Sequence, residues 1–266
     1  MMKRIAAVAV SLIFLSACRP SDKELLERAE SAALQQKGQV AKQFYLQIIQ
    51  KRSRKDEVRL GALQGLAEVS LSQLSDYPTA VSAYEKIIEE FDNEPFFKNR
   101  VPEFRFKAAR VYRIHLQKLQ RAYDVILPVL QKKYSVEIDA AMAEEVGRIH
   151  LARREFNEAE KQFIKAFEQI SSCKGLSRLQ LDLVQTYTLA KNCDRALEWS
   201  ARPLPGECKR DDYSLAIERA RCYEINGDPA KALRIYEEMI VDTPKNSRLH
   251  FLRDALKRRM KDKQKR

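Results

Sequence analysis

The chain has 266 residues and a formal net charge of +12 at neutral pH, with 49 Lys and Arg residues against 37 Asp and Glu. Ala, Leu, Gln, Glu, Lys and Arg are abundant, and only seven residues are glycine. This composition favours helices and argues against a sheet-based fold, and the length suits one long array or two compact domains.

The first 18 residues have the pattern of an export signal. Lys3 and Arg4 precede an apolar run over residues 5–15, which is shorter than the roughly 20 residues of a permanent membrane span. The run ends in Leu15-Ser16-Ala17-Cys18, which resembles the lipobox of bacterial lipoproteins. The resemblance implies that residues 1–17 are a signal peptide that is removed, and that Cys18 becomes the acylated N-terminus, carrying palmitate or a similar chain. An ordinary secretory signal with a chance cysteine is the alternative.

The same resemblance implies that the mature chain is lipid-anchored in the cell envelope and faces the periplasm. Arg19, rather than Asp, follows the cysteine, which favours the outer membrane under the familiar sorting rule of such lipoproteins. Outside the cytoplasm, nucleic acid is not an expected partner for a basic chain. Anionic lipid head groups, cell-wall polymers and acidic protein segments suit its positive charge better.

Small and aromatic residues recur in six segments, at residues 22–51, 60–92, 102–134, 140–173, 177–203 and 213–246. In the last segment, Ala220 and Tyr223 lie on one expected helix, and Ala232 and Tyr236 lie on the next, after the turn Gly227-Asp228-Pro229. Small residues allow two helices to cross closely, and the aromatic rings fill the space beside them. The equivalent second-helix alanines recur at intervals of 36 to 42 residues: Ala41, Ala80, Ala122, Ala159, Ala196 and Ala232.

This pattern resembles the tetratricopeptide repeat (TPR), in which two antiparallel helices are joined by a short turn. The resemblance implies an all-α fold, a right-handed superhelical solenoid of about six TPR-like helical hairpins over residues 18–245. One hairpin buries too little apolar surface to offset its ordering entropy, so the repeats must stack. Residues 246–266 are expected to form a C-terminal capping helix through Leu249, Leu252 and Leu256, followed by a basic tail.

The TPR resemblance also implies a groove lined by the first helix of each repeat. Its register places the following residues in that groove: Glu103, Phe106, Arg110, Arg113, Glu144, Arg148, Leu151, Arg178, Leu181, Gln185, Thr188, Ile217, Arg221 and Glu224. Arg110, Arg113, Arg148, Arg178, Gln185 and Arg221 are the predicted partner-binding residues, because the planar guanidinium fork suits carboxylates and extended peptides. The alternative is a solvated row of arginines, and extra residues in the third repeat could turn Arg110 and Arg113 out of the groove.

Four cysteines fall between residues 173 and 222, in a compartment that permits oxidation. No C-x-x-C pair is present and His115, His150 and His250 lie elsewhere in the sequence, so no metal site is expected. The repeat register favours the disulfides Cys173–Cys208 and Cys193–Cys222, each across one repeat junction. Four cysteines allow three pairings, and free buried thiols are the alternative.

The sequence contains no G-x-S-x-G, H-E-x-x-H, phosphate-binding loop or Rossmann glycine pattern, so neither an enzyme nor a cofactor is expected. The predicted function is a lipid-anchored scaffold that binds a protein partner in its groove during envelope or outer-membrane protein assembly. It resembles repeat-bearing envelope lipoproteins such as the one in the outer-membrane β-barrel assembly machinery. The alternative is an accessory factor of cell-wall metabolism that binds peptidoglycan or a wall enzyme. The basic tail has a possible contact with anionic lipid or glycan.

Overall fold

The computed structural model describes residues 20–97, 99–130 and 134–264, so the predicted signal peptide and Cys18 lie outside the described residues. The described residues form thirteen α-helices and one 3-10 turn, without strands, which confirms the all-α class. The chain divides into two compact units, one ending at Ser75 and the other beginning at Asp76. The repeat predicted over residues 60–92 spans this division, with its first helix in one unit and its second helix in the other.

The first unit contains α1 (Asp22–Leu34), α2 (Gly38–Lys51) and α3 (Glu57–Ser72). Its first hairpin packs through the fully buried Ala29 and Ala41, with Tyr45 beside them. Ser21 caps α1 in a reciprocal pair with Glu24. These local signals explain why the short segment folds as a hairpin with α3 packed on it.

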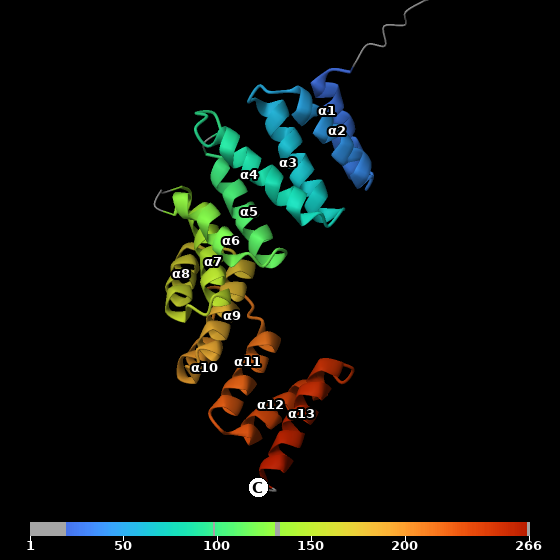
Figure 1. Cartoon of the computed structure of the whole chain (residues 1–266). Coiled ribbons are helices and arrows are strands. Elements are labelled where there is room, and N and C mark those ends of the chain that lie inside the picture. The colour runs from blue at the N-terminus through green and yellow to red at the C-terminus, as the bar shows by residue number, and fades with distance from the viewer. Residues whose placement is uncertain (1–19, 98, 131–133, 265–266) are drawn as a thin grey trace, which may run out of the picture. The chain divides into compact units, whose positions relative to one another are not determined.

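The second unit holds ten helices. They are α4 (Tyr77–Phe91), α5 (Val101–Ile114), α6 (Leu119–Ile126), α7 (Val136–Ala152), α8 (Phe156–Gln169), α9 (Cys173–Leu189), α10 (Cys193–Ala201), α11 (Asp212–Ile225), α12 (Pro229–Asp242) and α13 (Ser247–Gln264). Four helical hairpins follow one another: α5 with α6, α7 with α8, α9 with α10, and α11 with α12 (Figure 1). Within each hairpin we call the first helix A and the second helix B. The close crossing predicted from small residues is present, since a Cβ added at Gly147 would lie 2.7 Å from the Phe163 ring.

One residue in the left-handed backbone conformation follows each of α1, α3, α5, α7, α9 and α11. These residues are Gln36, Ser75, Gln117, Arg154, Lys191 and Gly227, with φ between 51° and 80°. At Lys191 the chain reverses, and the amide of Asn192 donates to the carbonyl of Tyr187 at 2.9 Å, which closes the helix end. The left-handed residues recur at the same intervals as the second-helix alanines. The turns after these six helices therefore share one backbone feature, although only the last one uses glycine.

The A helices of the second unit form a continuous row. Helix α5 packs against α7, α7 against α9, and α9 against α11, whereas no comparable packing joins successive B helices in the described residues. B helices instead pack under the A helix of the next repeat, as α8 does under α9. The A helices therefore line the inner side of this stack.

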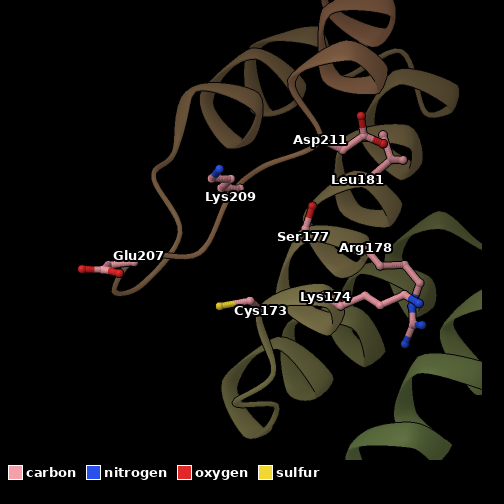
Figure 2. A pocket seen from close by; sticks show the side chains of 8 residues that line it. All are labelled: Cys173, Lys174, Ser177, Arg178, Leu181, Glu207, Lys209 and Asp211. Carbon is pink, nitrogen blue, oxygen red and sulfur yellow. The ribbon is translucent and has the colours of Figure 1, made fainter.

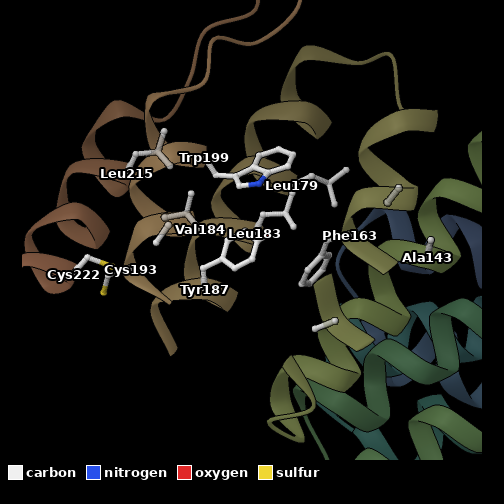
Figure 3. Packing of buried hydrophobic residues seen from close by; sticks show 13 residues of the cluster. Ala143, Phe163, Leu179, Leu183, Val184, Tyr187, Cys193, Trp199, Leu215 and Cys222 are labelled. Atoms are coloured by element: carbon white, nitrogen blue, oxygen red, sulfur yellow. The ribbon is translucent and has the colours of Figure 1, made fainter. Parts of the chain in front are cut away.

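The core lies between the A and B helices. In Figure 3, Phe163, Leu179, Leu183, Tyr187 and Trp199 converge from α8, α9 and α10, and all are buried. At the C-terminal end, Leu249 and Leu256 of α13 are buried in a cluster with Tyr236 and Ala232, so α13 is the capping helix that the sequence predicted. Asn246 caps α13 by accepting from the amide of Leu249 at 3.2 Å. Among the described helices, none combines the length and apolar character that a membrane span requires.

Candidate functional site

The A helices are joined by charged side chains about one repeat apart in sequence. Arg148 of α7 donates to Asp182 of α9 at 2.7 Å and also pairs with Glu144 at 2.9 Å. Arg178 of α9 donates back to Glu144 at 2.6 Å. Two cations and two carboxylates thus bridge α7 and α9 in alternation.

An ion pair also joins α5 to α7, and a longer hydrogen bond joins α9 to α11. Arg113 of α5 makes a bidentate contact with Glu145 of α7, at 2.7 and 3.0 Å. Arg221 of α11 pairs with Glu218 at 2.7 Å, and Gln185 of α9 donates to Glu218 at 3.5 Å. We call this set the inter-helix ladder: Arg113, Glu144, Glu145, Arg148, Arg178, Asp182, Gln185, Glu218 and Arg221.

Burial has the largest effect on the pKa values of two ladder carboxylates, Asp182 and Glu218. It raises the pKa of Asp182 above its ordinary value, although the Arg148 guanidinium beside it acts in the opposite direction. Burial likewise raises the pKa of Glu218 against the effect of Arg221. For Arg148, burial alone lowers the pKa, but Asp182 and Glu144 outweigh it and raise the pKa. The carboxylates are therefore held out of water at a cost that the arginines partly offset.

The ladder changes the role of the predicted arginine row. Five of the six predicted partner-binding residues belong to it: Arg113, Arg148, Arg178, Gln185 and Arg221. Their polar groups already have partners within the chain, so the ladder joins repeats and is not a row of free guanidinium groups. Arg110 is exposed and lies over the Phe106 ring, 5.6 Å from its centre. Its charge remains on the surface of α5.

Two pockets lie at opposite ends of α9, one beside the N-terminus and one beside the C-terminus. The first, of about 550 Å³, lies between α9 and the loop before α11 (Figure 2). Figure 2 shows Lys174, Ser177 and Arg178 on the helix, and Glu207 and Lys209 on the loop. We call it the loop-edge pocket. It is lined by Cys173, Lys174, Ser177, Arg178, Leu181, Glu207, Lys209 and Asp211.

The second pocket, of about 590 Å³, lies where α9 and α11 end, beside α13. We call it the turn-edge pocket. It is lined by Thr188, Leu189, Lys191, Arg221, Glu224, Ile225 and Arg259. Thr188, Arg221 and Glu224 were expected to line the groove, and the structure brings these three together. Arg178 and Leu181 likewise meet in the loop-edge pocket.

One wall of the loop-edge pocket is fixed covalently. Cys173 and Cys208 form a disulfide with their Cα atoms 4.9 Å apart, which is one of the two predicted bridges. Arg210 adds a second restraint, since its guanidinium donates to the Ala201 carbonyl at 3.1 Å at the end of α10. The loop is therefore tied to both helices of the fifth repeat.

The predicted bridge between Cys193 and Cys222 was wrong for this structure, in which both are free, buried thiols. They lie beside each other at the junction of α10 and α11 (Figure 3). Burial, with a contribution from the Cys222 side chain, raises the pKa of Cys193 to about 12. A thiol with that pKa carries almost no thiolate at neutral pH, and thiolate is the species that forms disulfides.

The described residues contain no group of three or more His, Cys, Asp or Glu side chains placed to hold a metal ion. His150 instead contacts Glu155, with Nδ1 and Oε2 2.6 Å apart, and stacks edge-on against Tyr123. That environment matches a packed histidine at the end of an A helix.

Sequence reasoning missed Leu189, Lys191, Ile225 and Arg259 in the turn-edge pocket, and Glu145, Asp182 and Glu218 in the ladder. A signal for the ladder was present, because Arg148 and Asp182, and Glu144 and Arg178, are pairs of opposite charge 34 residues apart. No comparable signal pointed to Arg259, since its place in the pocket depends on how α13 packs.

No protein-family model matches the sequence, and no curated protein matches it. Solved structures do resemble the fold. PilF of Pseudomonas aeruginosa is 12% identical, with a TM-score of 0.59 over 88% of this chain and 97% of that one. A tetratricopeptide repeat protein from Parabacteroides merdae is 15% identical, with a TM-score of 0.52 over 91% and 86%. BtubC from P. vanneervenii is 15% identical, with a TM-score of 0.54 over 70% and 84%. At these identities the likeness shows the fold alone: the chain has a TPR-type helical-repeat fold.

Proposed function

We propose that the chain is a non-catalytic, lipid-anchored scaffold of the cell envelope that binds a protein partner along its A helices. The partner is taken up during envelope or outer-membrane protein assembly, and the scaffold faces the periplasm with its lipid at Cys18. The TPR-type fold supports a protein-binding role, and the lipobox-like Leu15-Ser16-Ala17-Cys18 supports the anchor.

The observation that carries the binding role is the position of the two pockets. Both open beside the inner row of A helices, at the two ends of α9. Helix α9 has 17 residues, so it is about 25 Å long. An extended or helical segment of a partner can follow that length and place a side chain in each pocket.

The anchor is tested by acylation in cells. Cells that express the full chain are fed an alkyne-labelled palmitate, and the chain is then captured and assayed for the label. We expect the wild-type chain to be labelled and to fractionate with membranes, whereas Cys18→Ser is unlabelled. An unlabelled wild-type chain that is soluble after export contradicts the anchor.

The partner is identified by crosslinking in the native envelope, affinity capture of the intact chain and mass spectrometry. Recovery of outer-membrane assembly subunits or unfolded outer-membrane proteins supports the proposed role. Recovery of no protein above the level seen with an unrelated lipoprotein contradicts it.

The basic helix α13 favours a second candidate, an accessory factor of cell-wall metabolism. Its exposed face carries Lys257, Arg258, Arg259 and Lys261, which suit anionic glycan or lipid surfaces. Sedimentation with purified peptidoglycan separates the two candidates. Retention without any protein partner favours the second, and a chain that stays in the supernatant favours the first.

A further inference from the structure

The turn-edge pocket has an excess of positive charge. Lys191, Arg221 and Arg259 line it, against Glu224 as its one lining carboxylate. Arg221 is held by the buried Glu218 beneath the pocket, and Arg259 is held by Glu224 at 2.5 Å. Lys191 has no ion-pair partner among the residues that the structure describes. Lys191 is thus available to a ligand. Arg259 is paired with the Glu224 carboxylate, which a ligand carboxylate can replace.

The pocket also has an apolar floor beside these charges. Leu189 is 58% exposed at the end of α9, and Ile225 is 44% exposed at the end of α11. Two exposed apolar side chains in one pocket offer a partner an apolar surface to cover. Because α9 and α11 are adjacent A helices, the two side chains lie in one pocket.

We infer that the turn-edge pocket binds an acidic, apolar segment of a partner protein, with an apolar side chain on Leu189 and Ile225 and carboxylates on Lys191 and Arg259. This inference rests on the proposed function and specifies the partner's chemistry at one place. Charge complementarity selects this occupant, since a lining of three cations and one carboxylate disfavours a basic segment. Helix α13 is then a binding element as well as a cap, because it supplies Arg259.

The ion pair between Glu224 and Arg259 provides a way to test the inference. A carboxylate of the chain itself already occupies the Arg259 guanidinium, and a partner carboxylate takes its place on binding. Removing the charge of Glu224 therefore releases Arg259 and strengthens binding of acidic segments. Glu224 also accepts a hydrogen bond from the Tyr236 hydroxyl at 3.1 Å, which the amide oxygen of Gln retains. Glu224→Gln is thus a gain-of-function variant, which a folding defect does not mimic.

The test uses the purified full-length chain and fluorescent dodecapeptides with blocked ends, measured by fluorescence polarisation. The first peptide contains Asp, Glu, Leu and Phe, the second replaces the acidic residues with Lys, and the third replaces the apolar residues with Ala. We expect the first to bind with Kd below about 100 µM and the other two at least about tenfold more weakly. Binding should weaken as salt rises from 50 to 300 mM.

Substitutions of charged residues in the turn-edge pocket test whether the first peptide binds there. Lys191→Glu and Arg259→Gln should each weaken binding of the first peptide about tenfold, and Glu224→Gln should strengthen it about threefold or more. Arg258→Glu is the matched control, since Arg258 is exposed on the same helix but does not line the pocket. It should leave Kd within about twofold.

Four results overturn the inference: no binding of the first peptide at 1 mM, equal binding of the Lys peptide, no gain from Glu224→Gln, or equal losses from Lys191→Glu and Arg258→Glu. Self-association of the chain that disappears with Lys191→Glu also overturns it, because the occupant is then a second copy. The proposed function is judged separately by envelope crosslinking, so a captured partner with an unused turn-edge pocket leaves that function standing.

Discussion

Arg148 of α7 and Asp182 of α9 lie 34 residues apart in sequence and form a 2.7 Å ion pair between adjacent A helices. Adjacent repeats are therefore joined by a polar contact as well as by their apolar core. A solenoid is held together by such interfaces between neighbouring repeats. Loss of one ion pair between two repeats therefore lowers the stability of the stack.

Arg148→Ala should lower the free energy of unfolding by about 3 kcal/mol, because it removes the ion-pair partner of the buried Asp182 and leaves Glu144 paired with Arg178 alone. Chemical denaturation of the wild-type and variant chains measures the difference. Arg110→Ala is the control, since Arg110 is exposed on α5, and it should change the free energy by less than about 0.5 kcal/mol. Equal effects of the two substitutions contradict a structural role for the ladder. Arg148 is consequently a poor choice for testing partner binding.

Glu218→Gln should change how stability depends on pH. Burial raises the folded-state pKa of Glu218 above its ordinary value of 4.5, so the ionised carboxylate costs stability at neutral pH. That cost is absent below the ordinary value and grows as the pH rises through the folded pKa. We therefore expect the stability of Glu218→Gln, relative to wild type, to increase between pH 4 and pH 7.5. Urea denaturation at both pH values measures this difference, and a relative stability that falls over the interval contradicts the assignment.

The Cys173–Cys208 disulfide should contribute about 3–4 kcal/mol of stability, since it closes a loop with a sequence separation of 35. Reductant should lower the denaturation midpoint of the wild-type chain. The variant with Ser at both positions should already have the lowered midpoint and should not respond further. Cys193→Ser is a matched control at a free thiol, and its response to reductant should equal that of wild type. A wild-type midpoint unaffected by reductant argues against a contribution from the bridge.

Arg154→Gly should raise stability by about 0.5–1 kcal/mol. Arg154 lies in the turn after α7 with φ of 61°, a conformation that costs an L-residue energy and that glycine adopts freely. Gly227 lies in the turn after α11 with φ of 80°, so Gly227→Ala should lower stability by about 1 kcal/mol. Thermal melts of both variants measure the opposite shifts. Shifts of the same sign would falsify the shared turn geometry.

The sequence predicted the hairpins because their signals are local. Ala159 and Phe163, or Ala232 and Tyr236, stand four residues apart on one helix, and their packing needs no knowledge of the neighbouring repeat. The disulfide Cys173–Cys208 was predicted from the repeat register, which places both cysteines in connections between repeats. The predicted bridge between Cys193 and Cys222 also crosses one repeat junction, but both thiols are free and buried in the core, where burial raises the pKa of Cys193 to about 12.

The site was predicted less well because it depends on contacts between repeats. The register placed Arg148 and Arg178 on the A helices, but the acidic residues that hold them, Glu144 and Asp182, act across a helix junction. Arg259 reaches Glu224 only because α13 folds back over the last hairpin. Such contacts follow from how hairpins stack, and the spacing of residues within one repeat does not contain them.

The most direct test of partner binding at the inner row is photocrosslinking from defined positions in living cells. A photoreactive phenylalanine replaces Leu189 in the turn-edge pocket or, as the control, the exposed Lys165 on the B helix α8. The account predicts a protein adduct from position 189 after illumination and none from position 165. An adduct from position 165 alone, or adducts of equal yield from both positions, would contradict binding along the A helices.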